Sequence, residues 1–180
     1  MENSNKETSD LAGWKMSKND SLIHFIGTAD ELNAHLGLVR AILANEDAWQ
    51  FSWQHACQFI EKVQKNMMKM MSHVSNSKDE KYFFQENEVA EMDREITRLL
   101  GVIPKQKKFS IPGKNIIEAQ IQIARTVARR TERLYAAIYE EQTLCPNAGA
   151  YLNKLSDYLY YLSQQESLVN VNFINQIAGI

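Results

Sequence analysis

Apolar residues recur at intervals of three and four along almost the whole chain. Only seven glycines and three prolines interrupt this pattern in 180 residues, so breaks between elements are sparse. A spacing of three to four residues is typical of amphipathic helices, whereas strands alternate at every second residue. The pattern therefore predicts an all-α protein, without a clear strand.

The pattern divides into five helices joined by short connections, at about residues 28–45, 49–74, 86–100, 115–141 and 147–168. At the first of them, "TADE" matches a capping box: the Thr28 hydroxyl can accept from the Glu31 amide, and the Glu31 carboxylate can reach back to the cap. Gly101 stands where the third helix should end, and Pro146 where the fifth should begin. Five helices with short connections predict a helical bundle with up-and-down topology.

The length and charge of the chain narrow its class. A chain of 180 residues fits one domain with a substantial core, so 1–180 is predicted to be a single helical domain. The net charge of −2 and the pI near 6.1 give no overall attraction to nucleic acid or to an anionic membrane. The start "MENSNKETSD" is unlike a signal peptide, and no apolar run could span a bilayer. We expect a cytoplasmic protein that binds neither nucleic acid nor membrane.

Four of the chain's seven arginines fall in "ARTVARRTER", 124–133, although no lysine occurs between 115 and 153. On a helix, three of these arginines share one side with a glutamate, one arginine lies at the edge, and the opposite side is apolar. Like charges one turn apart disfavour a helix by roughly 0.2–0.5 kcal/mol each, so the cluster does not serve helix stability. The preference for arginine favours bidentate binding of phosphate or carboxylate over a merely hydrated face. The shared side holds Arg125, Arg129, Glu132 and Arg133, the edge Arg130, and the apolar side Ile123, Val127, Leu134 and Ile138.

The fifth helix also has two faces. One carries Leu152, Leu155, Leu159 and Leu162, and the other Asn153, Ser156, Asp157 and Tyr160. A polar face is usually just hydrated. If it lies opposite the arginines, however, Asn153 and Asp157 could contact a base or ribose through amide and carboxylate groups. Together the two helices suggest a cationic site of nucleotide size.

Four segments resemble, in the same order, signature segments of the PduO-type ATP:cob(I)alamin adenosyltransferases: "FIGTADELNAHLG" (25–37), "FSIPGKN" (109–115), "ARTVARRTER" (124–133) and "YLNKLSDYLYYLS" (151–163). The resemblance runs from about Lys15 to Ser163. It implies the family's ferritin-like five-helix bundle, assembled as a homotrimer with active sites between subunits. It also implies a reaction in which the Co(I) of reduced cobalamin attacks the 5′ carbon of ATP, releasing triphosphate and giving adenosylcobalamin, with Mg²⁺ accompanying ATP.

The resemblance implies roles for single residues at the nucleotide. By motif position, Arg129, Arg130 and Glu132 contact ATP and its Mg²⁺, with Glu132 as the residue for the metal. Asn153 matches the family's nucleotide-contacting asparagine. Lys18, in "SKND", falls where the family has a phosphate-binding lysine.

Further roles concern catalysis and the corrin. Arg125 and Arg129 match the family's catalytic arginines, and Arg125 should pair with Asp30 of a neighbouring subunit. Phe109 matches an aromatic residue that crowds the lower face of the corrin and favours loss of the lower axial ligand. Loss of that ligand eases reduction to Co(I).

The chain departs from the family pattern near both ends. The family opens with a glycine-rich phosphate loop like "TGDKGxT", but here "MENSNKETSDLAGWK" has no glycine before Gly13, so 1–20 is predicted to be a divergent N-terminal loop segment. In "IPGKN", Lys114 stands where the family prefers a second glycine. The tryptophan that the family usually carries near its C-terminus has no counterpart in "NVNFINQIAGI".

These departures leave three interpretations open. The chain is an active adenosyltransferase with altered ATP affinity, or a catalytically impaired relative that binds corrinoid or nucleotide as a carrier, sensor or partner. The third is a helical interaction protein whose arginines bind an acidic partner. Under the first two, a cobalamin reductase or a B12-dependent enzyme is the expected protein partner.

Overall fold

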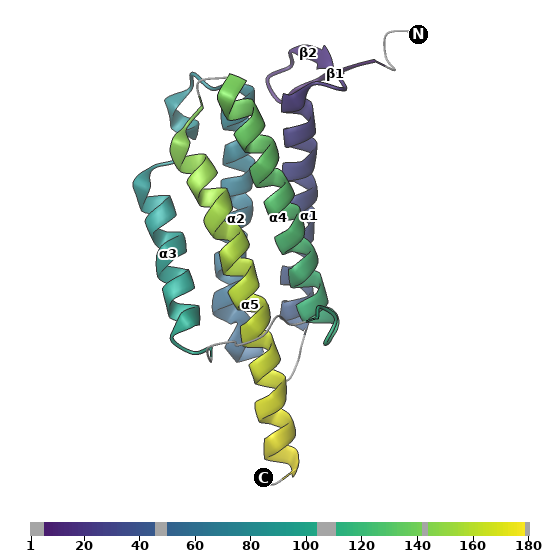
Figure 1. Cartoon of the computed structure of the whole chain (residues 1–180), viewed down its shortest axis with the longest axis vertical. Coiled ribbons are helices and arrows are strands. Elements are labelled where there is room, and N and C mark those ends of the chain that lie inside the picture. The colour runs from purple at the N-terminus through teal and green to yellow at the C-terminus, as the bar shows by residue number, and fades with distance from the viewer. Residues whose placement is uncertain (1–5, 46–49, 104–110, 142–143, 179–180) are drawn as a thin grey trace.

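In the computed structural model, five long helices run alternately up and down in one bundle (Figure 1). The structure describes residues 6–45, 50–103, 111–141 and 144–178, without the side chains at 45, 50–52, 141 and 166–178. Within these ranges the helices are α1 (Ser21–Asn45), α2 (Gln50–Ser75), α3 (Glu86–Leu100), α4 (Ile116–Glu141) and α5 (Pro146–Ala178). The predicted all-α, five-helix architecture is confirmed.

A small antiparallel hairpin of two strands, β1 (Glu7–Ser9) and β2 (Lys15–Ser17), precedes the bundle. In its turn the Asp10 carboxylate accepts from the amides of Ala12 and Trp14 at 3.0 and 2.8 Å. Gly13 adopts the positive φ of 86° that closes the turn, a conformation that favours glycine. The N-terminal segment is therefore not a loop throughout. The sequence did not reveal the hairpin because strands of three residues are too short to show an alternating pattern.

The predicted start of the first helix at Thr28 is wrong. α1 begins earlier, where the Asp20 carboxylate accepts from the amide of Leu22 at 2.9 Å and caps the helix. The Thr28 hydroxyl lies inside the helix and donates to the carbonyl of His24 at 2.8 Å. The apolar stripe continues upstream through the buried Leu22, so burial carries the helix across the local capping signal.

The other boundaries lie close to the predicted ones, with one exception at the C-terminus. α5 continues to Ala178 and extends beyond the ends of the other helices, opposite the hairpin (Figure 1). α3 ends at Leu100 and Gly101 caps it as expected, but Gly101 has a right-handed φ of −68°, so no left-handed cap forms there. A short 3-10 helix, η2 (Glu80–Tyr82), lies in the connection before α3. None of the described helices carries a stretch long and apolar enough to cross a bilayer.

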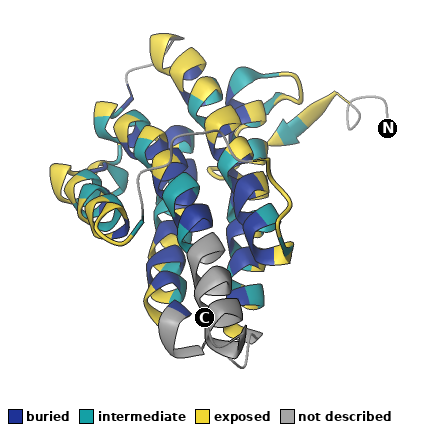
Figure 2. Ribbon diagram, turned by 60° about the horizontal axis from the view of Figure 1, so that its bottom comes forward, coloured by how far each residue is buried: buried dark blue, intermediate teal, exposed yellow. Residues whose placement is uncertain are grey.

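α4 packs between α1 and α5, while α2 packs on α1 and α3 on α5. In Figure 2 the ribbon coloured as buried lies mainly on the sides of the helices that face the middle of the bundle, and the ribbon coloured as exposed lies mainly on the outer sides. Aromatic pairs fill the centre: the rings of Phe25 and Tyr135 meet edge to face at 5.5 Å, and those of Phe59 and Tyr158 at 4.9 Å. Because α4 has neighbours on both sides, its outer face is bordered by α1 and by α5.

A buried histidine joins α2 to the start of α5. His73 Nε2 accepts from the amide of Cys145 at 3.0 Å, so that nitrogen carries no proton in the folded protein. Nδ1 is buried and has no hydrogen-bond partner in the described part of the chain. Burial, together with the nearby charge of Lys69, lowers the pKa of His73 from its ordinary value. The fold therefore holds His73 neutral.

We expect the protein to lose stability as the pH falls, in part through His73. Its pKa is lower in the folded than in the unfolded chain, so its contribution is present above the unfolded value of 6.5 and is lost below it. His73→Gln keeps an acceptor without a titrating group. Denaturant unfolding at pH 7.5 and pH 5.5 should show a smaller loss of unfolding free energy in the variant than in the wild type. Equal losses in both proteins would contradict this assignment.

Candidate functional site

The arginine-rich stretch lies on the outer face of α4. Arg129, Arg130 and Arg133 are exposed, and Arg125 is half-buried. The prediction that Ile123 lies on an apolar, core-facing side of α4 is wrong for this residue, because Ile123 is 44% exposed, whereas Val127 and Ile138 on the same predicted side are buried. Ala124 and Ala128 are fully buried, so the core-facing side of α4 includes them. That side consists of Ile117, Ile121, Ala124, Val127, Ala128, Thr131, Tyr135 and Ile138.

The polar face of α5 meets the arginine-bearing face of α4. The amide nitrogen of Asn153 donates to Oε1 of Glu132 at 2.8 Å, which links the two helices at the surface. Asp157 is exposed one turn further along α5. The structure thus brings together the two faces that the sequence suggested could combine.

Arg130 points the other way, toward α1. Its guanidinium forms an ion pair with the carboxylate of Glu31, and both side chains are largely exposed. An exposed pair of this kind stabilises a fold by about 0–1 kcal/mol at most. From the sequence, Glu31 was interpreted as part of a helix cap. Its contact with Arg130 could not be predicted, because that contact depends on how α1 and α4 pack.

The remaining arginines of α4 form no ion pair with any side chain that the structure describes. Arg125 donates from Nε to Oε1 of Gln122 at 2.6 Å, which leaves its two terminal nitrogens available. Within the described ranges, Arg129 and Arg133 have neither an ion pair nor a side-chain hydrogen bond. Since a guanidinium stays protonated in proteins, this face carries permanent positive charge that attracts an anion.

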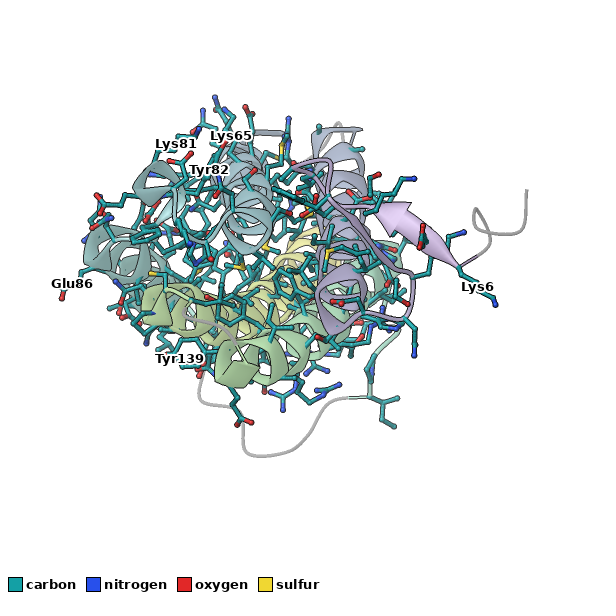
Figure 3. The ribbon with its side chains drawn as sticks, turned by 90° about the horizontal axis from the view of Figure 1, so that it is seen from above. Lys6, Lys65, Lys81, Tyr82, Glu86 and Tyr139 are labelled. Atoms are coloured by element: carbon teal, nitrogen blue, oxygen red, sulfur yellow. The ribbon has the colours of Figure 1, made fainter. Side chains whose placement is uncertain are left out.

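A hollow of about 330 Å³ opens between α4 and α5 next to this cationic face. Glu132 lines the hollow and also accepts from Asn153, so this groove between α4 and α5 adjoins the contact between the two side chains. Tyr139 lies at the periphery of the bundle, on the opposite side from Lys65 and Lys81 (Figure 3).

Tyr135 lines the hollow as a neutral side chain. Burial raises the pKa of Tyr135, and its hydroxyl donates to the carbonyl of Cys145 at 2.8 Å. The hollow is lined by Glu132, Tyr135, Ala136, Tyr139, Pro146 and Gly149.

Three further predicted residues lie apart from this groove or beyond the described ranges. Lys18 follows β2 and is exposed, and its amide donates to the carbonyl of Lys6 at 2.9 Å. Asp30 is exposed on α1, and Arg125 of the same chain is not its partner in the described structure. Phe109 lies outside the described residues.

The start of α4, which follows the "FSIPGKN" segment, is held by a buried carboxylate. Glu118 Oε2 accepts from the amides of Gly113 and Lys114 at 2.7 and 3.2 Å. Gly113 has a positive φ of 105°, which favours glycine at this turn. The carboxylate thus holds the turn at Gly113 and Lys114 that leads into α4.

The arrangement of acidic side chains around Glu132 suits a metal ion that arrives together with a ligand better than one that is bound by protein side chains alone. In the ranges that the structure covers, no three His, Cys, Asp or Glu side chains form a preformed metal cage. Glu132 uses Oε1 for Asn153, which leaves Oε2 for a cation. Mg²⁺ is commonly held by one or two carboxylates together with substrate phosphates and water, which matches a single carboxylate beside a cationic face.

Comparison with known proteins gives the family. The family model for cobalamin adenosyltransferases matches residues 3–166. The curated relatives include the corrinoid adenosyltransferase PduO of Citrobacter freundii, 28% identical over 160 residues, which cover 87% of this chain and 45% of that protein. Another corrinoid adenosyltransferase from the same organism is 29% identical over 170 residues, 90% of each chain. The chain thus spans less than half of the first relative and most of the second.

Solved structures share the fold. A variant of the PduO-type ATP:corrinoid adenosyltransferase from Lactobacillus reuteri, complexed with cobalamin and ATP, has a TM-score of 0.81 at 22% identity, over 93% of this chain and 89% of that one. Another variant of that protein, complexed with ATP, has a TM-score of 0.80 at 22% identity, over 93% and 92%. With a family model that spans nearly the whole bundle, the chain belongs to the cobalamin adenosyltransferase family.

Proposed function

We propose that this protein transfers the 5′-deoxyadenosyl group of ATP to the cobalt of cob(I)alamin, giving adenosylcobalamin and triphosphate. The observation that carries the proposal is the exposed Arg129 and Arg133 of α4, which have no ion pair in the described structure, beside the Glu132–Asn153 contact, in a chain of this family. The relatives are named corrinoid adenosyltransferases, and the similar structure holds cobalamin and ATP. ATP and cobalamin are thus the ligands that the groove is proposed to meet.

The reaction requires cationic groups at the leaving triphosphate. The electron pair of Co(I) attacks C5′ of ATP, the cobalt–carbon bond forms, and the C5′–O bond breaks with its electrons staying on the triphosphate. Arg129, with no local partner in the described structure, is proposed to contact that growing charge, and Arg125 to support it. Preorganised donors of this kind usually supply the largest catalytic contribution, because they do not reorient during the reaction.

The neighbouring residues would bind and orient the nucleotide. The Glu132 carboxylate accepts from the amide nitrogen of Asn153. The amide oxygen of Asn153 is therefore left to accept from a ribose or base. Mg²⁺ would arrive with ATP and neutralise phosphate charge, with Glu132 as the residue placed to hold it. Arg130 would contact the phosphates only after leaving Glu31, and Lys18 would approach them from the segment before α1.

The active unit is proposed to be a homotrimer with sites between subunits. The apolar side chains of Leu38 on α1 and Ile123 on α4 are 47% and 44% exposed, on helices that pack together. Where exposed apolar side chains form one contiguous patch, they favour a contact with another chain. Asp30 of one subunit would pair with the free terminal nitrogens of Arg125 in the next. Phe109 would lie against the lower face of the corrin.

Asp30→Asn tests the subunit contact. Loss of this charge would leave Arg125 without its partner at the interface, and such a truncation costs about 2–5 kcal/mol for a buried pair. The variant should dissociate at higher protein concentration than the wild type in sedimentation velocity, with lower activity. Asp93→Asn, which removes a pair with Lys154 inside one chain, is the control and should assemble normally. Unchanged assembly and activity of Asp30→Asn would contradict the pairing.

Product analysis separates the proposed function from its competitors. Protein, Mg-ATP and chemically reduced cobalamin are incubated without oxygen, and adenosylcobalamin and triphosphate are quantified by chromatography. Equal amounts of the two products support transfer. Calorimetric binding of cobalamin or ATP without product would instead identify a carrier or sensor, and absence of binding to both would favour a helical interaction protein.

The setting of the enzyme follows from the same chemistry. A cytoplasmic location suits an enzyme that consumes ATP. Because the attacking species is Co(I), a cobalamin reductase is proposed to supply it. A B12-dependent enzyme is proposed to receive the adenosylcobalamin.

A further inference from the structure

A chain of buried hydrogen bonds leads from the backbone of α5 to the guanidinium of Arg125. The Ser163 hydroxyl donates to the carbonyl of Tyr160 at 2.7 Å. Its oxygen accepts from Nε2 of Gln122 at 2.9 Å, and Oε1 of Gln122 accepts from Nε of Arg125 at 2.6 Å. Gln122 is 5% exposed and Ser163 is fully buried, so water does not compete for these groups.

The direction of the chain is determined at Ser163. A hydroxyl has one proton, and this proton is used by the carbonyl of Tyr160, so the oxygen can only accept from Gln122. The nitrogen of the Gln122 amide must therefore face α5, and its oxygen must face Arg125. Gln164 reinforces this order, since its Nε2 also donates to the Ser163 oxygen, at 3.3 Å. The amide of Gln122 cannot flip without losing both of its bonds.

In this arrangement Nε of Arg125 is hydrogen-bonded to Gln122, and the two terminal nitrogens of the guanidinium remain available. The bond at Nε fixes the plane of the guanidinium, and the fork of terminal nitrogens then projects from the half-buried base of the arginine face. A long side chain that would otherwise sample many rotamers is held in one orientation before any ligand binds. Because the other end of the chain is on α5, the orientation of Arg125 depends on how α4 and α5 pack.

From this geometry we infer that Gln122 is a positioning residue, which orients Arg125 for adenosyl transfer through Ser163 on α5. The inference rests on the proposed function for its catalytic consequence. The hydrogen bond to Arg125 itself does not depend on that function. The two parts can therefore be tested separately.

The test uses Gln122→Met, which keeps the length and burial of the side chain and removes both hydrogen bonds. Gln120→Met is the matched control on the same helix, because Gln120 bonds His35 on α1 and not the arginine face. The first readout is solvent exchange of the Arg125 Nε proton by ¹⁵N NMR, assigned with Arg125→Lys. Exchange should accelerate at least about tenfold in Gln122→Met and stay unchanged in Gln120→Met, since only the former loses the acceptor.

The second readout is steady-state adenosyl transfer. Loss of one charge-assisted bond predicts a fall in kcat of roughly 10- to 100-fold in Gln122→Met, with KM for cobalamin within about twofold of the wild type. In an Arg125→Ala background, Gln122→Met should change kcat by less than about twofold, because the arginine that Gln122 positions is already absent. A purely structural role for Gln122 would instead give additive losses in the two backgrounds.

The exchange measurement tests the contact between Gln122 and Arg125, and the kinetic measurement tests its effect on the reaction. Unchanged exchange of the Arg125 proton would overturn the positioning contact. Faster exchange with an unchanged kcat, or additive losses, would overturn its role in the reaction. An inactive wild-type protein would refute the proposed function, and the exchange measurement would then decide alone whether Gln122 holds Arg125.

Discussion

Arg129→Ala is expected to abolish adenosyl transfer while the bundle stays folded. The side chain is exposed and has no partner in the described structure, so its removal takes away neither packing nor an internal bond. In the proposed reaction it contacts the leaving triphosphate, and loss of one preorganised donor typically lowers kcat by about 10²–10³. The measurement is the initial rate of adenosylcobalamin formation at saturating ATP and cobalamin, with the thermal midpoint measured in parallel.

The control is Arg94→Ala on α3, which removes an exposed arginine away from the groove between α4 and α5. It should leave rate and thermal midpoint unchanged. Turnover by Arg129→Ala at the wild-type rate would remove this arginine from the site. A large fall in thermal midpoint would show instead that Arg129 has a structural role.

Leu152→Ala should destabilise the protein more than any surface substitution discussed above. Leu152 is fully buried on α5, next to the exposed Asn153. Removing a buried leucine side chain costs the transfer free energy of the lost carbons and leaves a cavity, together about 2–5 kcal/mol. Urea unfolding should show this as a lower midpoint with an unchanged slope.

Leu100→Ala serves as the comparison, because Leu100 is 50% exposed at the end of α3 and should lose less than about 1 kcal/mol. The pair tests the rotation of α5 about its axis. With Tyr151 and Leu152 both buried, Asn153 lies at the edge of the buried side of α5, where it is exposed and contacts Glu132. Equal losses in both variants would mean that α5 is rotated, and the contact between Asn153 and Glu132 would then be in doubt.

Much of the fold could be predicted from the sequence, because the apolar spacing marks the buried stripe of each helix. α2, α3 and α4 begin and end close to the predicted residues. The start of α1 could not be located in this way, since a good capping signal at Thr28 lies inside a longer apolar stripe. Local signals specify possible ends, and burial decides which of them is used.

The site was predictable only in so far as it depends on single helices. The two polar faces suggested a shared site only on the condition that they meet, and the contact of Asn153 with Glu132 fulfils that condition. The contacts of Arg130 with Glu31 and of Arg125 with Gln122 were missed. The first depends on the packing of α1 against α4. The second could have been suspected from a glutamine one residue after Ile121 and two before Ala124, both of which are buried.

The most direct measurement is anaerobic turnover of the purified wild-type protein with chemically reduced cob(I)alamin and Mg-ATP, followed by absorbance. If the arginine face of α4 suffices without a glycine-rich loop, the Co(I) spectrum should convert to that of adenosylcobalamin, at a rate that saturates with ATP and falls on Arg129→Ala. Absence of conversion at high ATP, while cobalamin still binds, would contradict adenosyl transfer and leave a binding protein with this fold.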